Sequence, residues 1–289
     1  MTSWSDETWK LVIDRLNRGV ITPFLGAGAC YGALPTGGEL AEEMATQAAY
    51  TLGDPRNLLE VSQYLSVTVD PLFPKEQVHR RFFGAAPPNF ADPTEPHALL
   101  AEFPISVYLT TNYDDFMFRA LARNRIRAPI RDFYRWTPAL ESYPSPLDDT
   151  FEAHAAHPLV YHLHGMLNLE KEDPDPLLAH SLILTEDDYI RFLSTQHSLP
   201  APVSAAIRQN SCLFIGYRLA DWNLRVILQA LKTELPTRNF AVLPLWGRDE
   251  KERDATRSYF DKYYGSALNI QVYWGTAQEF CQELRARMR

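Results

Sequence analysis

Short apolar runs, separated by polar and glycine-rich segments, recur along the whole chain. They lie at residues 20–25, 106–111, 158–165, 212–217, 240–246 and 269–274, and turn-forming residues bound most of them. Runs this short are typical of buried strands, and most are followed by apolar residues at helical spacing. The alternation predicts an α/β fold with a mostly parallel, doubly wound sheet.

Two helices are expected around the first strand. Residues 6–18 carry Trp9, Val12 and Leu16 on one helical face, and Gly19 follows as a stop signal. Residues 39–50, ELAEEMATQAAY, form the second helical pattern. The order strand, glycine turn and helix is that of a nucleotide-binding unit, so the sheet is expected to be Rossmann-like.

Two segments do not follow the alternation. Residues 54–97 and 180–209 contain helical patterns and predict a small helical insert layer over the cleft, within a single domain spanning residues 1–289. The acidic, proline-broken segment 170–179 is expected to be an exposed loop.

Charge, cysteine content and hydropathy disfavour three classes of protein: nucleic-acid binders, four-cysteine zinc proteins and membrane proteins. The chain has 28 basic and 36 acidic residues and a net charge of −8, which disfavours direct nucleic-acid binding. Cys30, Cys212 and Cys281 are the three cysteines, far apart in sequence, which fits a reducing, cytoplasmic location and provides no four-cysteine zinc site. We find no targeting segment and no apolar stretch long enough for a membrane span, so no membrane contact is expected.

In open parallel sheets, ligands bind beyond the carboxyl ends of the strands. The candidate chemistry is therefore in the segments that follow the apolar runs. They are Gly26-Ala27-Gly28, residues 111–115 (TNYDD), residues 162–165 (HLHG) and residues 216–221 (GYRLAD).

The glycine-containing segments have two readings each. Gly26 and Gly28 either let backbone amides reach a phosphate or make an ordinary tight turn. Gly216 is likewise a glycine that directly follows a predicted strand. Asp221 is placed either to contact a ligand or to cap the helix that follows it.

The polar segments also leave alternatives open. Asn112 either orients a substrate hydroxyl or water, or makes a turn while Asp114 or Asp115 caps the next helix. His164 is a candidate for catalysis or a buried structural residue. His162 and His164 share one strand face, which permits a metal-binding reading without an obvious third ligand.

GAGAC, TTNYDD, HLHG and GYRLAD, in this order at strand ends, resemble the sirtuin-like NADase family of bacterial anti-phage defence systems. LILTEDDYIRFL and YWGTAQEF are also similar to that family, and the resemblance covers nearly the whole chain. Two departures from sirtuin deacylases matter. The four-cysteine zinc module is missing, which disfavours deacylation, and Arg218 stands where relatives often carry serine.

The resemblance implies cleavage of NAD+ into nicotinamide and ADP-ribose without a metal. Asn112 would hold the nicotinamide ribose or the attacking water, and His164 would act as general base or ribose-hydroxyl partner with an imidazole pKa suited to neutral pH. Asp114 would help to place the nicotinamide end. The expected NAD+-binding residues are Gly26, Ala27, Gly28, Thr111, Asp114, Gly216, Tyr217 and Asp221.

The resemblance also implies regulation, because a constitutive NADase would kill its host. We expect a homo-oligomer or a regulatory partner such as a HerA-type ATPase or an Argonaute-like protein. Two other functions stay open: a zinc-free deacylase or ADP-ribosyltransferase, and a catalytically silent nucleotide-binding scaffold. The arginine-rich segment 119–136 is either a solvated helix end and loop or a contact surface for a second copy or a partner.

Overall fold

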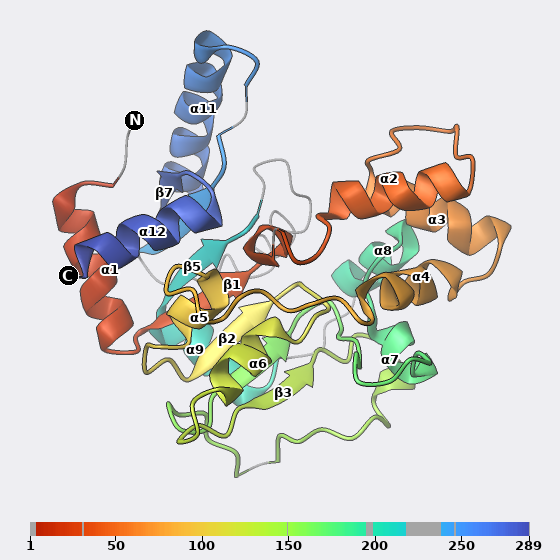
Figure 1. The fold of residues 1–289 in the computed structure, drawn as a ribbon, viewed down its shortest axis with the longest axis horizontal. Helices are drawn as coiled ribbons and strands as arrows, with labels where there is room; N and C mark the ends of the chain where they lie inside the picture. Colours follow the sequence, from red (N-terminus) through yellow and green to blue (C-terminus); the bar gives the residue numbers. More distant parts are fainter. Residues whose placement is uncertain are drawn as a thin grey trace.

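The computed structural model describes residues 4–30, 32–148, 150–194, 199–217, 238–245 and 247–288. These residues form a seven-stranded sheet in the order β3-β4-β2-β1-β5-β6-β7, in which every neighbouring pair is parallel (Figure 1). The strands are β1 (Ile21–Leu25), β2 (Val107–Thr110), β3 (Ile130–Phe133), β4 (Leu159–His162), β5 (Ser211–Ile215), β6 (Asn239–Leu243) and β7 (Ile270–Trp274). The predicted α/β fold with a parallel sheet is confirmed.

Each of the six apolar runs overlaps one of these strands, and β3 is the strand that the sequence pattern missed. It lies inside the arginine-rich segment, at one edge of the sheet, and pairs with β4. Its four residues, IRDF, include two charged side chains, so no apolar run marks it. These residues form a strand because they pair with β4, and local sequence does not reveal that pairing.

Helices cover both faces of the sheet. The α-helices are α1 (Asp6–Asn17), α2 (Gly37–Gln47), α3 (Leu58–Thr68), α4 (Phe73–Phe82), α5 (Pro96–Leu100), α6 (Phe116–Ala122), α7 (Pro176–Ser181), α8 (Glu186–Ser194), α9 (Ala201–Gln209), α11 (Glu250–Leu268) and α12 (Ala277–Arg287), with 3-10 turns η1 (Ala27–Cys30) and η2 (Pro138–Leu140). No helix in the described ranges is long and apolar enough to cross a membrane.

Neighbouring residues of each strand pack into opposite cores. Phe24 and Phe214 belong to the core that includes Ile207 of α9. Leu25 and Ile215, one residue further along, belong to the core that includes residues of α1, α6 and α12. Strands buried on both faces explain why the runs are continuously apolar instead of alternating.

Capping groups set where two predicted helices begin. Ser5 accepts a hydrogen bond from the amide of Thr8 at the start of α1. Thr36 and Glu39 form a capping box, so α2 begins at residue 37, two residues before the apolar pattern indicated.

Helices α2, α3, α4, α7 and α8 form a group at one end of the sheet, on the side toward which the arrows of β2 and β3 point (Figure 1). Met44 of α2, Val61 of α3 and Val78 of α4 belong to one core, whereas Leu178 of α7 and Tyr189 of α8 belong to the core that includes Phe24. The expectation of an exposed loop at residues 170–179 is wrong at its end, because α7 begins at Pro176 and buries Leu178.

Candidate functional site

The carboxyl ends of the central strands lie in one row. Leu25 pairs with both Thr110 and Ile215, and Thr110 pairs with His162. The four predicted segments follow these residues, so their described parts begin along the same edge of the sheet. The strand order also changes direction between β1 and β5, where sheets of this kind bind ligands.

The glycine loop after β1 packs against the turn after β5. The amides of Gly26 and Gly28 donate to the carbonyl oxygens of Ile215 and Gly216, both at 2.8 Å. A Cβ atom on either glycine would lie 2.9 Å from the Gly216 oxygen. The glycines therefore let two loops touch, and these two amides already have acceptors within the protein. Ala27 lies between them, half-buried, in η1.

Thr111 and Tyr217 join the ends of β1, β2 and β5. The Thr111 hydroxyl donates to the Tyr217 phenol at 3.3 Å, and that phenol donates to the Leu25 carbonyl oxygen at 3.1 Å. Both side chains are buried. The last predicted segment is described only as far as Tyr217, so Arg218 and Asp221 lie outside the described residues.

Asn112 is half-buried, and its side-chain amide is held in one orientation. Its Nδ2 donates to the Gly26 carbonyl oxygen at 3.1 Å and to Cys30 Sγ at 3.2 Å. A carbonyl oxygen can only accept, so the nitrogen must face Gly26. The Asn112 Oδ1 is therefore the atom of this side chain that can accept a hydrogen bond from a ligand.

The two acids after Asn112 have different surroundings. Asp114 Oδ1 accepts from the amide of Phe116, the first residue of α6, at 2.9 Å, as the capping alternative predicted. Asp115 makes no such bond, and lies 3.7 Å from Arg119 and 4.0 Å from Arg131. Burial raises the pKa of Asp115 despite these two guanidinium groups. Asp114 contacts the end of the glycine loop, because its Oδ2 lies 3.3 Å from Cys30 Sγ.

His162 and His164 are both completely buried. His162 Nδ1 lies 2.9 Å from the main-chain oxygen of Asn112, to which it donates, and so supports the loop that carries Asn112. His164 Nδ1 lies 3.3 Å from the hydroxyl of Tyr189, and the rings of Tyr189 and Phe192 meet the imidazole edge to face. Within the described residues, the Nε2 atoms of both histidines have no hydrogen-bond partner.

The expectation that His164 titrates near neutral pH is wrong. Burial lowers its pKa to about 3, and burial together with the charge of Arg131 lowers the pKa of His162 to about 3 as well. Both imidazoles are therefore neutral at pH 7. A neutral imidazole with a free Nε2 can accept a hydrogen bond, but it holds a proton only weakly.

The structure also assembles a group that the sequence reading missed. Cys30 Sγ lies 3.3 Å from Asp114 Oδ2 and 3.8 Å from His97 Nε2, and all three side chains are buried. His97 Nδ1 is in turn 2.7 Å from Glu95 Oε1. These residues come from three separate stretches of sequence, so no local spacing signals that they meet. His162 and His164 take part in no three-residue group of this kind among the described residues.

A model of the SIR2-like domain matches residues 106–268, more than half of the chain and three of the four candidate segments. This chain belongs to the SIR2-like family. The resemblance to a sirtuin-like family is thereby confirmed.

Three curated relatives of this SIR2-like chain are each named NAD(+) hydrolase ThsA. They come from Acinetobacter baumannii (strain 532279), 29% identical over 141 residues, Enterococcus faecium, 28% over 145 residues, and Bacillus cereus (strain MSX-D12), 28% over 142 residues. Each match covers 48–49% of this chain and 25% of the relative. The chain thus matches about a quarter of the length of these relatives.

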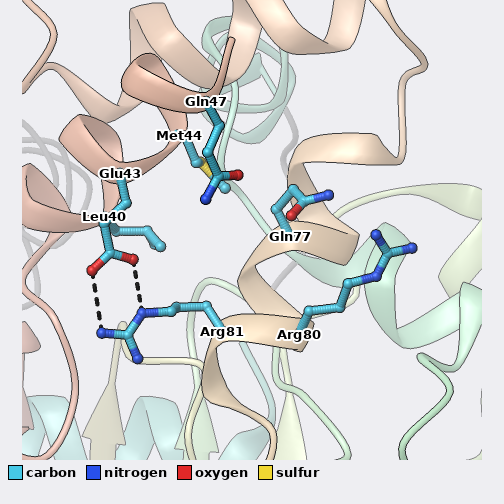
Figure 2. Close-up of a pocket in the computed structure, with 7 residues that line it drawn as sticks. All are labelled: Leu40, Glu43, Met44, Gln47, Gln77, Arg80 and Arg81. Carbon is cyan, nitrogen blue, oxygen red and sulfur yellow. Dashed lines mark hydrogen bonds and ion pairs between the residues drawn. The ribbon is translucent and has the colours of Figure 1, made fainter.

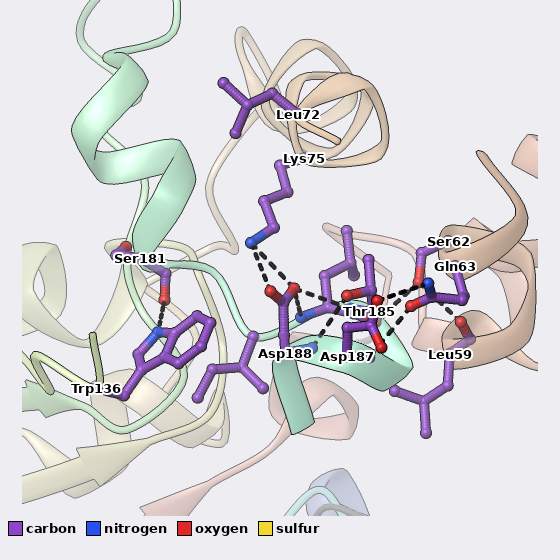
Figure 3. A network of polar contacts seen from close by, with 12 residues as sticks. Leu59, Ser62, Gln63, Leu72, Lys75, Trp136, Ser181, Thr185, Asp187 and Asp188 are labelled. Atoms are coloured by element: carbon purple, nitrogen blue, oxygen red, sulfur yellow. Dashed lines mark hydrogen bonds and ion pairs between the residues drawn. The ribbon is translucent and has the colours of Figure 1, made fainter. Parts of the chain in front are cut away.

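A buried ion pair anchors the helix that packs on His164 in this SIR2-like chain. Figure 3 shows the Lys75 ammonium on α4 beside the Asp188 carboxylate on α8, 3.0 Å apart. Asp188 Oδ2 also accepts from the amides of Leu184 and Thr185, both at 3.1 Å. These bonds set the start of α8, which carries Tyr189 to His164. The LILTEDDYIRFL stretch therefore acts as a support for the candidate site.

The surface pocket in Figure 2 is lined by residues of two helices and by none of the strand ends. It measures about 220 Å³, between α2 and α4, and an ion pair of Arg81 with Glu43 at 2.7 Å lines it. None of its lining residues is a predicted site residue. The pocket therefore carries no part of the proposed chemistry.

Most of the arginines in segment 119–136 of the SIR2-like chain serve the fold. Arg135 forms an ion pair with buried Asp132 at 2.9 Å, and Arg127 donates to a main-chain oxygen at 2.7 Å. Arg125 and Ile126 are exposed, Ile126 by 81%. Arg119 and Arg123 are exposed as well, and the contact surface expected over this segment stays a prediction.

The two buried histidines predict a loss of stability in acid. Their pKa of about 3 in the fold, against 6.5 in the unfolded chain, means that the unfolded chain binds more protons between these values. The free energy of unfolding should therefore fall as the pH drops below 6.5, by about 2 kcal/mol per histidine between pH 7 and pH 5. Urea unfolding at the two pH values measures this difference.

Two matched variants test whether the buried histidines cause the loss of unfolding free energy between pH 7 and pH 5. His164→Asn should remove about half of the difference, whereas His157→Asn, which changes an exposed histidine, should leave it unchanged. An unaltered difference in His164→Asn would show that burial of this imidazole is not the cause.

Proposed function

We propose that this SIR2-like chain hydrolyses NAD+, breaking the bond between nicotinamide and ribose. The observation that carries the proposal is the contact of Asn112 with both the glycine loop, through Gly26, and the buried His162, beside the switch point of the sheet. The names of the three relatives support the substrate. The products are nicotinamide, ADP-ribose and a proton.

For this hydrolysis, the main task of the protein is to position NAD+ and the attacking water. Nicotinamide leaves as a neutral molecule from a cationic precursor, so no strong general acid is needed, and the ribose passes through an oxocarbenium-like state. Water adds to the ribose carbon and loses a proton. Asn112 Oδ1 accepts a hydrogen bond from that water or from a ribose hydroxyl, and its Nδ2 bonds keep it in place.

His164 serves this reaction as a neutral acceptor. Its free Nε2 receives a hydrogen bond from a ribose hydroxyl or from the attacking water while Tyr189 holds Nδ1. With a pKa of about 3, the imidazole orients its partner as a hydrogen-bond acceptor and does not retain the proton that the water loses.

The remaining roles follow the predicted assignment. The loops of Gly26, Ala27, Gly28 and Gly216 lie against the pyrophosphate and bind it through groups other than the Gly26 and Gly28 amides, which are engaged within the protein. Thr111 and Tyr217 contact the nucleotide while their hydroxyls join the strand ends, Asp114 places the nicotinamide end, and Asp221 contacts the nucleotide.

The same proposal extends to the biological setting. The resemblance supports depletion of NAD+ in anti-phage defence by a cytoplasmic effector, held inactive by assembly with copies of itself or with a regulatory protein such as a HerA-type ATPase or an Argonaute-like protein. Exposed Arg125 and Ile126 are candidate contacts.

Incubation of the purified chain with NAD+ tests the activity. Release of nicotinamide with one equivalent of ADP-ribose supports hydrolysis. Transfer of ADP-ribose or removal of an acyl group from a protein substrate would establish the deacylase or transferase alternative. Binding without turnover would establish the scaffold alternative, which the complete burial of His164 favours.

Turnover is expected to need no metal, because every proposed step uses the chain's own groups or water. Treatment with a strong chelator should therefore leave the initial rate of nicotinamide release unreduced, in the same buffer and at the same NAD+ concentration. Loss of activity on chelation, with recovery when zinc is returned, would contradict this mechanism.

A further inference from the structure

Cys30, His97 and Asp114 offer one thiol, one imidazole and one carboxylate to a common point. Their ligand atoms all lie within 4.8 Å of one another. Zinc bonds of about 2.0–2.3 Å in tetrahedral geometry place neighbouring ligand atoms about 3.3–3.8 Å apart. The observed separations of 3.3 Å from Sγ to Oδ2 and 3.8 Å from Sγ to Nε2 match that spacing.

The surroundings of the three side chains fit metal ligation. The His97 Nδ1 proton is directed at Glu95 Oε1, 2.7 Å away, which leaves the Nε2 lone pair on the side of Cys30. This carboxylate–imidazole arrangement is common behind metal-bound histidines, where it fixes the tautomer. Asp114 is oriented by the amide of Phe116, so its Oδ2 faces the same point.

We propose that Cys30, His97 and Asp114 bind one thiophilic divalent cation such as Zn²⁺, and that the bound cation inhibits the enzyme. A sulfur and a nitrogen ligand favour zinc, cobalt or cadmium over magnesium and calcium, which prefer oxygen. Three protein ligands leave a fourth position for water. Binding displaces the thiol proton, now directed at Asp114, to the solvent.

The inhibition rests on the proposed function. A cation on Asp114 occupies the carboxylate assigned to the nicotinamide end. It brings two positive charges and displaces one proton, so the net charge of the three side chains rises by one. The nicotinamide ring of NAD+ and the transition state are both cationic, and this added charge opposes each of them. Asn112, whose amide donates to Cys30 Sγ, lies beside the change.

Cobalt is a visible probe that tests binding without using activity. The whole chain, stripped of metal, should take up one equivalent of Co²⁺, with a thiolate-to-cobalt charge-transfer band, and Zn²⁺ should displace it. Cys30→Ser should abolish the band and weaken binding at least a hundredfold. Cys212→Ser is the matched control, because it removes a buried thiol near the amino-terminal end of β5. This variant should keep both the band and the affinity for Co²⁺.

A second variant provides an independent test of the metal site if Cys30→Ser does not fold. Glu95→Gln alters the group behind His97, so it should keep the band and weaken Co²⁺ binding by about 10–100-fold. The proposal is overturned if the parent chain gives no thiolate band, or if the band survives in Cys30→Ser or is lost in Cys212→Ser. An undiminished affinity in Glu95→Gln would also count against it.

The inhibition is measured separately. Zn²⁺ at concentrations that fill the cobalt site should lower the rate of nicotinamide release at least tenfold, and a chelator should restore it. A chain that binds cobalt as described yet never hydrolyses NAD+ would contradict the proposed function and leave the metal site intact. Full turnover with the site filled would overturn the inhibitory role alone.

Discussion

Asn112→Ala should lower kcat for NAD+ hydrolysis by about a hundredfold to a thousandfold, the usual cost of removing one positioned polar group from an active site. The variant loses the Oδ1 acceptor together with the Nδ2 bonds to Gly26 and Cys30. Because the side chain is only half-buried, the stability of the fold should change little. Single-turnover release of nicotinamide, with thermal unfolding alongside, measures both quantities.

His164 needs gentler substitutions, because it is completely buried and alanine would leave a cavity as well as remove the imidazole. His164→Asn keeps a group near Nδ1 for Tyr189 and loses Nε2, so it should be about as inactive as Asn112→Ala. His164→Gln places a polar atom near Nε2 and should retain more activity. Equal activity of His164→Asn and the parent would remove His164 from the mechanism.

The control for these variants also follows from the structure. His162→Ala is not a suitable control, because His162 donates a hydrogen bond to the main-chain oxygen of Asn112 and its loss should disturb that residue. His157→Ala removes an exposed imidazole and should leave turnover unchanged.

Gly216→Ala should be among the most damaging single changes for the fold. Gly216 has a φ of +84°, and a Cβ there would lie 2.4 Å from the Ala29 nitrogen and 2.6 Å from the Gly26 oxygen. Both neighbours are backbone atoms and cannot turn aside, so strain and overlap together should cost more than about 3 kcal/mol. Urea unfolding measures the loss, and NAD+ binding should disappear with it.

Gly84→Ala separates backbone strain from overlap. Gly84 also has a positive φ, +73°, but nothing lies within 4 Å of the added Cβ. It should therefore cost only about 1–2 kcal/mol. If Gly216→Ala is no less stable than Gly84→Ala, the close packing of the two loops does not decide the stability of this edge.

Strand and helix order followed from local sequence. Six apolar runs mark the starts of six of the strands to within one residue, because strands covered on both faces are apolar throughout. The fold class then placed the segments that carry Asn112, His164 and Gly216 at one edge, since the carboxyl ends of parallel strands share an edge. Short edge strand β3 escaped detection because its pairing, and not its composition, makes it a strand.

The surroundings of each side chain were decided only by the tertiary structure. His164 lies after a strand end in sequence, yet it is completely buried beside Tyr189 and Phe192, and this burial lowers its pKa to about 3. Cys30 and His97 meet although 67 residues separate them. Burial and contact depend on which distant segments pack together. Sequence therefore determined which polar groups reach the edge of the sheet, and packing determined their charge and their partners.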